Sequence, residues 1–144
     1  LSIDFMDLNI IKIASDTSNN KVIKHYTDIA KQKNPLCGDH IEIKLNIYEN
    51  KIIDFAYQTK SCVFCQASAS MLSKKIIKKD ITSTKKLLMI AEKLFENDKI
   101  SLNSDLKTFK KIFNKKNLSR KECLLLPIKA LLKIIKQRNE QSKY

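Results

Sequence analysis

Residues 41–48 read IEIKLNIY, and residues 51–58 read KIIDFAYQ. The first stretch alternates apolar and polar side chains without interruption, which is the period-two pattern of a strand with one buried face. The second stretch resumes the alternation. The residues expected on its apolar face are Ile53, Phe55 and Tyr57. The sequence therefore predicts a β-hairpin over residues 40–59, with an apolar face that the rest of the chain must cover.

A short polar turn joins the two strands, formed by Glu49-Asn50 or by Asn50-Lys51. Asparagine suits either turn because it tolerates a positive φ. With a turn at this place, antiparallel pairing puts residue 37 roughly opposite residue 62. The hairpin thus brings together two positions that are distant in the chain.

Four helices are expected after the hairpin, because apolar residues recur there at helical spacing. The first begins at or just after Cys62. The residues expected to cap the second and the third are Thr82 or Ser83, and Asn103 or Ser104. The last helix spans Leu124 to Gln137, with Pro127 near its first turn, where a missing N–H is tolerated.

The patterns before the hairpin are weaker. Residues 22–30 have helical spacing, and Asn34-Pro35 ends that helix because the residue before a proline avoids the α region. A third strand over residues 5–14 is compatible with the sequence, and residues 1–20 otherwise form a poorly defined segment. We expect a single domain over residues 1–144. Its fold class is α+β, with a small antiparallel sheet, the hairpin and such a third strand from the N-terminus, covered on one face by four or five helices.

The composition is that of an ordinary globular protein, with 43% hydrophobic and 30% charged residues in a chain of 144. One glycine and two prolines exclude collagen-like proteins and glycine-rich phosphate loops. No apolar run approaches the length of about 18 residues that a membrane span needs. Residues 1–13 also lack the pattern of an export signal, so we expect a reducing cytoplasm, where cysteines serve metals or catalysis more often than disulfides.

The formal net charge is +13, and only Arg120 and Arg138 of the 28 basic residues are arginines. Abundant lysine, isoleucine and asparagine are what an AT-rich coding sequence produces without any binding function. A surface for nucleic acid more often mixes arginine and aromatic side chains with the lysines. We therefore interpret the lysines mainly as solvated faces and do not expect a nucleic-acid partner.

The residues that could carry chemistry are Cys37-Gly38-Asp39, Cys62, Cys65 and Cys123. The only glycine of the chain separates a thiol from a carboxylate, which indicates a backbone conformation that other residues adopt poorly. Hairpin pairing brings Cys37 and Cys62 together, and thiolates with a carboxylate can bind a metal ion tetrahedrally. Cys123, ahead of the last helix, could supply a fourth ligand. Cys65 fits either a metal site or the core.

Three motifs in this order resemble the iron–sulfur cluster assembly scaffolds of the NifU/IscU/SufU type. They are Asn34-Pro35-Leu36-Cys37-Gly38-Asp39, then Cys62 with the following Ala67-Ser68-Ala69-Ser70-Met71, and Arg120-Lys121-Glu122-Cys123. The resemblance covers about residues 20 to 137. The long interval between Cys62 and Cys123 is more similar to the SufU branch, and Glu122 stands where the IscU branch has a histidine. His25 and His40 match no ligand of the family.

The resemblance implies that Cys37, Asp39, Cys62 and Cys123 bind zinc or a [2Fe–2S] cluster. It implies a non-enzymatic scaffold or zinc-dependent sulfur acceptor that takes persulfide sulfur from a cysteine desulfurase and serves downstream apo iron–sulfur proteins. A sulfurtransferase role together with the desulfurase is compatible with this. We expect Cys123 to accept the sulfur, because a ligand at a helix start can swing out while ligands on a hairpin stay fixed.

Two other classes of protein stay open. One is a structural zinc module in which Cys37, Cys62, Cys65 and Cys123 close a Cys₄ site and lysine-rich faces bind RNA or an acidic protein. The other is an enzyme with a cysteine nucleophile, which no histidine in the sequence is placed to serve as a base.

Overall fold

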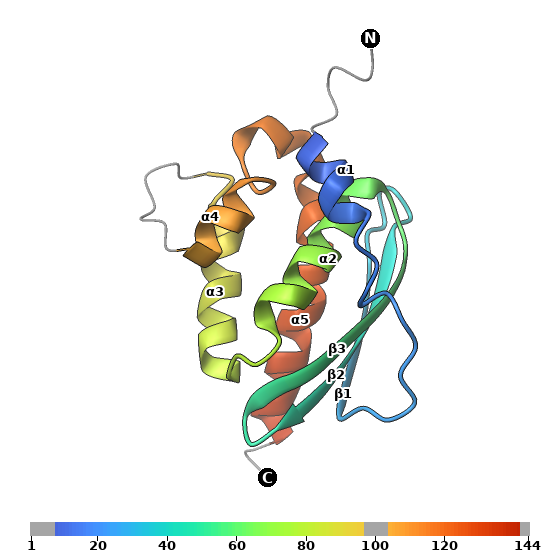
Figure 1. Cartoon of the computed structure of the whole chain (residues 1–144), viewed down its shortest axis with the longest axis vertical. Coiled ribbons are helices and arrows are strands. Elements are labelled where there is room, and N and C mark those ends of the chain that lie inside the picture. Colours follow the sequence, from blue (N-terminus) through green and yellow to red (C-terminus); the bar gives the residue numbers. More distant parts are fainter. Residues whose placement is uncertain (1–7, 97–103, 142–144) are drawn as a thin grey trace.

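A three-stranded antiparallel sheet forms one layer of the protein (Figure 1). The computed structural model describes residues 8–96 and 104–141. The strands are β1 (Asp28–Lys33), β2 (His40–Tyr48) and β3 (Lys51–Lys60), in the spatial order β1-β2-β3. The predicted hairpin is confirmed as β2 and β3. Its two-residue turn is the first of the two predicted, since Glu49 and Asn50 have φ values of 48° and 67°.

The apolar face of the hairpin differs from the prediction at one residue. The register pairs Asn46 with Asp54 but Ile47 with Ile52, so Ile53 is an extra residue in β3. Such a β-bulge shifts the side-chain alternation by one position. Ile52 is consequently buried and Ile53 is 57% exposed, so the prediction that Ile53 faces the core was wrong.

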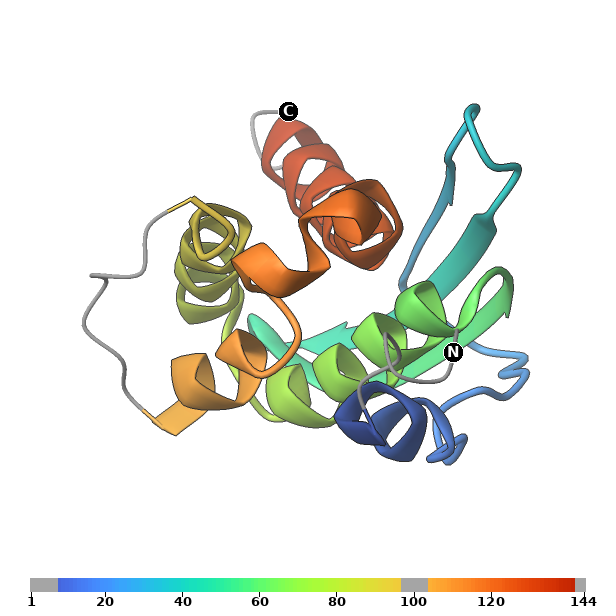
Figure 2. The same ribbon diagram turned by 90° about the horizontal axis from the view of Figure 1, so that it is seen from above.

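Helices cover one face of this sheet (Figures 1 and 2). They are α1 (Leu8–Ala14), α2 (Val63–Ile76), α3 (Ile81–Lys93), α4 (Ser104–Lys110), the 3₁₀ helix η2 (Lys115–Arg120) and α5 (Lys121–Gln141). α5 packs against β1 and β2, and α2 packs against β3. The predicted α+β class, with helices on one face of a small sheet, is confirmed.

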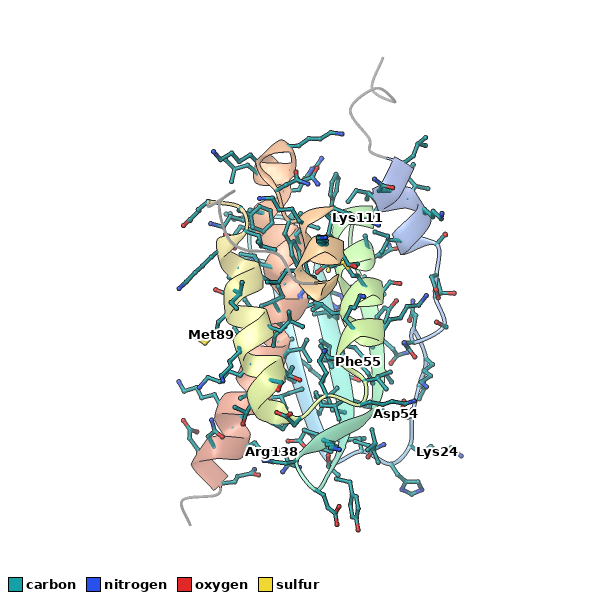
Figure 3. All side chains as sticks on the ribbon, turned by 60° about the vertical axis from the view of Figure 1, so that its left-hand side comes forward. Lys24, Asp54, Phe55, Met89, Lys111 and Arg138 are labelled. Atoms are coloured by element: carbon teal, nitrogen blue, oxygen red, sulfur yellow. The ribbon has the colours of Figure 1, made fainter. Side chains whose placement is uncertain are left out.

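The core lies between the sheet and the helices. Phe55 is fully buried there, pointing from β3 toward the helical layer, whereas Met89 projects outward from α3 (Figure 3). The stacked rings of Phe109 and Phe113, with centroids 5.7 Å apart, fill the space on the side of α4. Within the described ranges, none of the helices combines the length and the apolar character that crossing a bilayer requires.

The N-terminal predictions were wrong in type. The third strand is β1, at residues 28–33, where a helix over residues 22–30 was expected. Val22 was expected on the apolar face of that helix, but its side chain is 67% exposed. Residues 8–14, part of the stretch considered for a strand, form α1; residues 5–7 lie outside the described residues. Pairing with β2 decides the conformation of β1, and no local pattern shows that pairing.

The helices after the hairpin are confirmed, with shifted starts. The N-cap of α3 is Asp80, whose Oδ1 accepts a hydrogen bond from the Ser83 backbone N–H at 2.7 Å, so the expected caps lie inside the helix. Asn103 lies outside the described residues, and α4 begins at Ser104. α5 begins at Lys121, which puts Pro127 inside the helix, further from its start than predicted.

Candidate metal centre

The loop between β1 and β2 carries two of the predicted ligands. Its ends are closed by the Asn34 backbone N–H, which donates to the Asp39 carbonyl at 2.8 Å, and by the Gly38 N–H, which donates to the Asn34 carbonyl at 2.9 Å. The side-chain oxygen of Asn34 accepts from the Leu36 N–H at 3.0 Å. Gly38 has a φ of 76°, which confirms the expected need for glycine. This tight loop holds Cys37 and Asp39 on the same side.

Three predicted ligands meet at this end of the sheet. Cys37 Sγ, an Asp39 carboxyl oxygen and Cys123 Sγ all lie within 4.8 Å of one another. Cys37 is exposed, whereas Asp39 and Cys123 are buried. The Asp39 Oδ2 atom is buried and has no hydrogen-bond partner among the described residues. A buried oxygen without a partner is costly, and a cation beside it would satisfy it.

Cys62 lies next to this group. It is the N-cap residue of α2, directly after β3, and its side chain makes no capping hydrogen bond. The Cys62 thiol is half-buried, and its proximity contributes to the raised pKa of the Cys123 thiol. The structure therefore brings Cys37, Asp39 and Cys123 into one group and places Cys62 near one member of it.

Cys65 lies in the hydrophobic core. It is fully buried, and burial raises the pKa of its thiol to about 12. The Thr59 Oγ1 atom lies 4.0 Å from its sulfur, within hydrogen-bonding distance for a thiol. It lies outside the group that could hold a metal ion in the described part of the chain. Of the two roles open to Cys65, the packed thiol fits its position.

The electrostatics of the group favour a cation. The pKa of the Cys123 thiol is raised, first by burial, then by the hydrogen bond with Cys62 and by the proximity of Cys37 and Asp39. Several anionic groups gathered in a partly buried place disfavour one another's charged forms, and a bound metal ion reverses this effect. All four cysteines are free thiols, so none is withdrawn from metal binding by a disulfide.

Two residues near the site were not assigned a role from the sequence. Asn34 was interpreted only as a helix stop, but it organises the loop of Cys37 and Asp39. Arg120 lies three residues before Cys123, and its guanidinium stacks on the Phe64 ring at 5.4 Å from the centroid. The family motif that contains both Arg120 and Cys123 was a signal for Arg120. The role of Asn34 depends on the conformation of the loop between β1 and β2, which the sequence does not show.

Other titratable residues of the motifs point elsewhere. Glu122 is exposed and pairs with Lys129, with Oε2 and Nζ 2.7 Å apart. His25 and His40 are exposed and do not belong to the group of Cys37, Asp39 and Cys123.

Fold and site together define a small α+β protein with a group of thiols and one carboxyl at the end of its sheet, able to hold a metal ion. Residues 8–112 match the family model described as the NifU-like N terminal domain, and the chain belongs to this family. The family that the motifs indicated is thereby confirmed. The match ends before Cys123, so that cysteine is placed in the site by the structure rather than by the family model.

A curated relative agrees with this assignment, and two solved structures share the fold. The chain is 28% identical over 134 residues to the iron–sulfur cluster assembly scaffold protein IscU of Thermotoga maritima, covering 85% of this chain and 89% of that protein. A putative iron–sulfur cluster assembly scaffold protein for the SUF system of Fervidobacterium islandicum AW-1 has the same fold, with a TM-score of 0.79, 23% identity, and coverage of 94% and 99%. The N-terminal part of a NifU-like protein of Brucella abortus gives a TM-score of 0.84 at 19% identity, with coverage of 97% and 99%.

Proposed function

We propose that this protein is a scaffold for iron–sulfur cluster assembly, without enzymatic activity of its own. The observation that carries the proposal is the group of Cys37 Sγ, Cys123 Sγ and an Asp39 carboxyl oxygen, all within 4.8 Å of one another. In the same carboxyl, Oδ2 is buried and has no hydrogen-bond partner among the described residues. A protein of this family with such a group of sulfur and oxygen ligands is suited to bind iron and sulfide temporarily and to pass them on. The name of the Thermotoga maritima relative supports the same role.

The proposed ligands are Cys37, Asp39, Cys62 and Cys123. Three sulfur donors and one oxygen donor suit a tetrahedral zinc ion, and the same side chains suit the irons of a [2Fe–2S] cluster. The carboxylate is a harder ligand than the thiolates, so it weakens the hold on iron and keeps the cargo exchangeable. A bound metal ion would also keep the thiols deprotonated.

Sulfur is proposed to arrive as a persulfide on a cysteine desulfurase. A scaffold thiolate attacks the outer sulfur of that persulfide, the sulfur–sulfur bond breaks, and the desulfurase cysteine leaves as a thiolate, so no external oxidant or reductant is needed. Cys123 was predicted to be the acceptor and stays a prediction. Cys37 is the exposed thiol of the group, and its position allows a partner's persulfide to reach it first.

The branch and the partners are also part of this proposal. Glu122 is engaged with Lys129 and turned away from the donor group, which supports a SufU-like site without a histidine ligand. The proposed partners are a cysteine desulfurase and downstream apo iron–sulfur proteins. Four free thiols suit a reducing compartment such as the cytoplasm.

The test is the content of zinc, iron and acid-labile sulfide in protein purified without air, together with its visible absorption spectrum. Iron with an equal amount of sulfide supports the cluster scaffold, and stoichiometric zinc without sulfide supports the sulfur-acceptor form. Protein that retains neither metal in anaerobic buffer and cannot be reconstituted with either contradicts both.

Two variants separate the scaffold from a structural Cys₄ module. If the protein is a scaffold, Asp39→Ala should lower the amount of retained metal and Cys65→Ser should leave it unchanged. If it is a Cys₄ module, Asp39→Ala should leave the metal content unchanged and Cys65→Ser should abolish it. The core position of Cys65 favours the first outcome.

A further inference from the structure

Three basic side chains form a row across the sheet, at the end next to the cysteines. Lys33 of β1 pairs with His40 of β2, and His40 pairs with Lys60 of β3. Directly paired residues on adjacent strands point to the same face. All three side chains are exposed. Ile41, the neighbour of His40 on β2, is buried against the helices, so the three side chains lie on the opposite face of the sheet. We call Lys33, His40 and Lys60 the basic row.

The basic row lines a hollow of about 580 Å³. Its other lining residues are Asn20, Lys31, Gln32, Ile41, Glu42, Gln58 and Thr59. The remaining part of this sheet face is covered by the segment before β1. There the Asn46 side-chain amide donates to the His25 carbonyl at 3.0 Å, and Lys44 lies over the Tyr26 ring at 4.8 Å from its centroid. The hollow thus lies beside the part of the face that this segment covers.

The positive charge of the row is not neutralised within the described part of the chain. Glu42 is the acidic residue of the hollow, and its carboxylate is shared by Lys31 at 3.6 Å and Lys44 at 3.7 Å. Neither Lys33 nor Lys60 has an ion pair with any residue of 8–96 or 104–141. Lysines on outer strands can deter sheet-to-sheet pairing, but His40 lies on the central strand, where no such protection is needed.

The position of the row relates it to the candidate metal centre. Asp39 directly precedes His40, and Cys62 follows two residues after Lys60. A protein chain lying in the hollow would therefore be next to the exposed Cys37. We infer that the basic row docks an acidic segment of the cysteine desulfurase that delivers sulfur to this site. This inference rests on the proposed function.

The lining favours an acidic polypeptide over a nucleic acid. It contains no arginine and no Phe, Tyr or Trp side chain on which a base could stack. Gln58, Gln32 and Asn20 offer amides that can bond a peptide backbone. Lys33 and Lys60 lie two strand spacings apart, so carboxylates about 10 Å apart on the partner would engage both.

The test compares two variants of equal charge, Lys33→Gln/Lys60→Gln and the control Lys85→Gln/Lys86→Gln. The control lysines are exposed on α3, a helix on the other side of the sheet. The probe is a short fluorescent peptide of alternating Glu and Gly, followed by anisotropy at low salt. We expect the Kd of the peptide to rise about five-fold in the first variant, as two exposed ion pairs predict. The control should change it much less.

Two outcomes would overturn the inference. Equal loss of affinity in both variants would show that the peptide senses only the net charge. Tighter binding of a single-stranded oligothymidylate than of the peptide, lost in the first variant alone, would make the row a nucleic-acid site.

A second measurement separates this inference from the proposed function. With a cysteine desulfurase as donor of labelled sulfur, the first variant should raise the KM for the scaffold and leave kcat unchanged. If the unaltered protein accepts no sulfur, the proposed function fails, and the peptide titration still decides whether the basic row binds acidic chains.

Discussion

Removing the Asp39 carboxyl should stabilise the metal-free protein and weaken the metal-bound one. Its Oδ2 is buried without a hydrogen-bond partner, and an unsatisfied buried polar atom costs about 1–3 kcal/mol. Asp39→Ala removes this atom and keeps the main-chain bond from the Asn34 N–H to the Asp39 carbonyl. In the presence of a chelator, we expect the free energy of unfolding to rise by about 1 kcal/mol or more.

With zinc, the unaltered protein should become more stable than Asp39→Ala. Free zinc at about 100 times the Kd stabilises a folded protein by roughly 2.7 kcal/mol, and the variant, lacking one ligand, gains much less. Urea unfolding of both proteins, with chelator and with buffered zinc, measures the four free energies. Cys65→Ser is the control and should keep the full zinc effect, because Cys65 lies outside the donor group.

Either of two results would refute this reasoning. If Asp39→Ala is the less stable protein with chelator, the carboxyl has a structural role and is not a strained, unsatisfied group. If zinc stabilises the variant as much as the unaltered protein, Asp39 is not a ligand.

Three further predictions concern single residues. In metal-free protein at neutral pH, iodoacetamide should alkylate the exposed Cys37 first. Cys65 should react only on unfolding, because burial raises the pKa of its thiol to about 12. Peptide mass mapping measures both, and early modification of Cys65 would contradict its core position. Gly38→Ala should lower the free energy of unfolding in urea by about 1–2 kcal/mol, solely from the positive φ, since an added Cβ meets no atom within 4 Å. A much larger loss would indicate a clash that the structure does not contain. Ile52→Ala should destabilise by about 2–5 kcal/mol and Ile53→Ala by less than about 0.5 kcal/mol, and equal effects would exclude the bulge.

The hairpin could be predicted because its strands alternate strictly and its turn residues tolerate a positive φ. The exposed position of Ile53 could not, because two neighbouring isoleucines fit either register until the pairing across the strands chooses one. β1 was missed for a related reason: in this short edge strand only Ala30 is fully buried, so its sequence shows little alternation. A pattern limited to one segment cannot reveal a strand that depends on its neighbour.

The donor group was predictable to the extent that it depends on the hairpin. The position of the turn alone would pair His40 with Thr59, and the bulge shifts that partner by one residue to Lys60. Either register brings the loop of Cys37 close to Cys62. The position of Cys123 depends on how α5 crosses the sheet, which residue spacing alone does not determine; the family motif supplied it. The core position of Cys65 could be resolved only by packing, because its spacing from Cys62 fits a metal site equally well.

The central claim is that Cys37, Asp39, Cys62 and Cys123 bind one metal ion. X-ray absorption spectroscopy of the zinc-loaded protein tests it directly. The account predicts three sulfur ligands at about 2.3 Å and one oxygen ligand at about 2.0 Å, with the oxygen contribution changed in Asp39→Ala. Four sulfur ligands, unaffected by Asp39→Ala and reduced to three by Cys65→Ser, would contradict it.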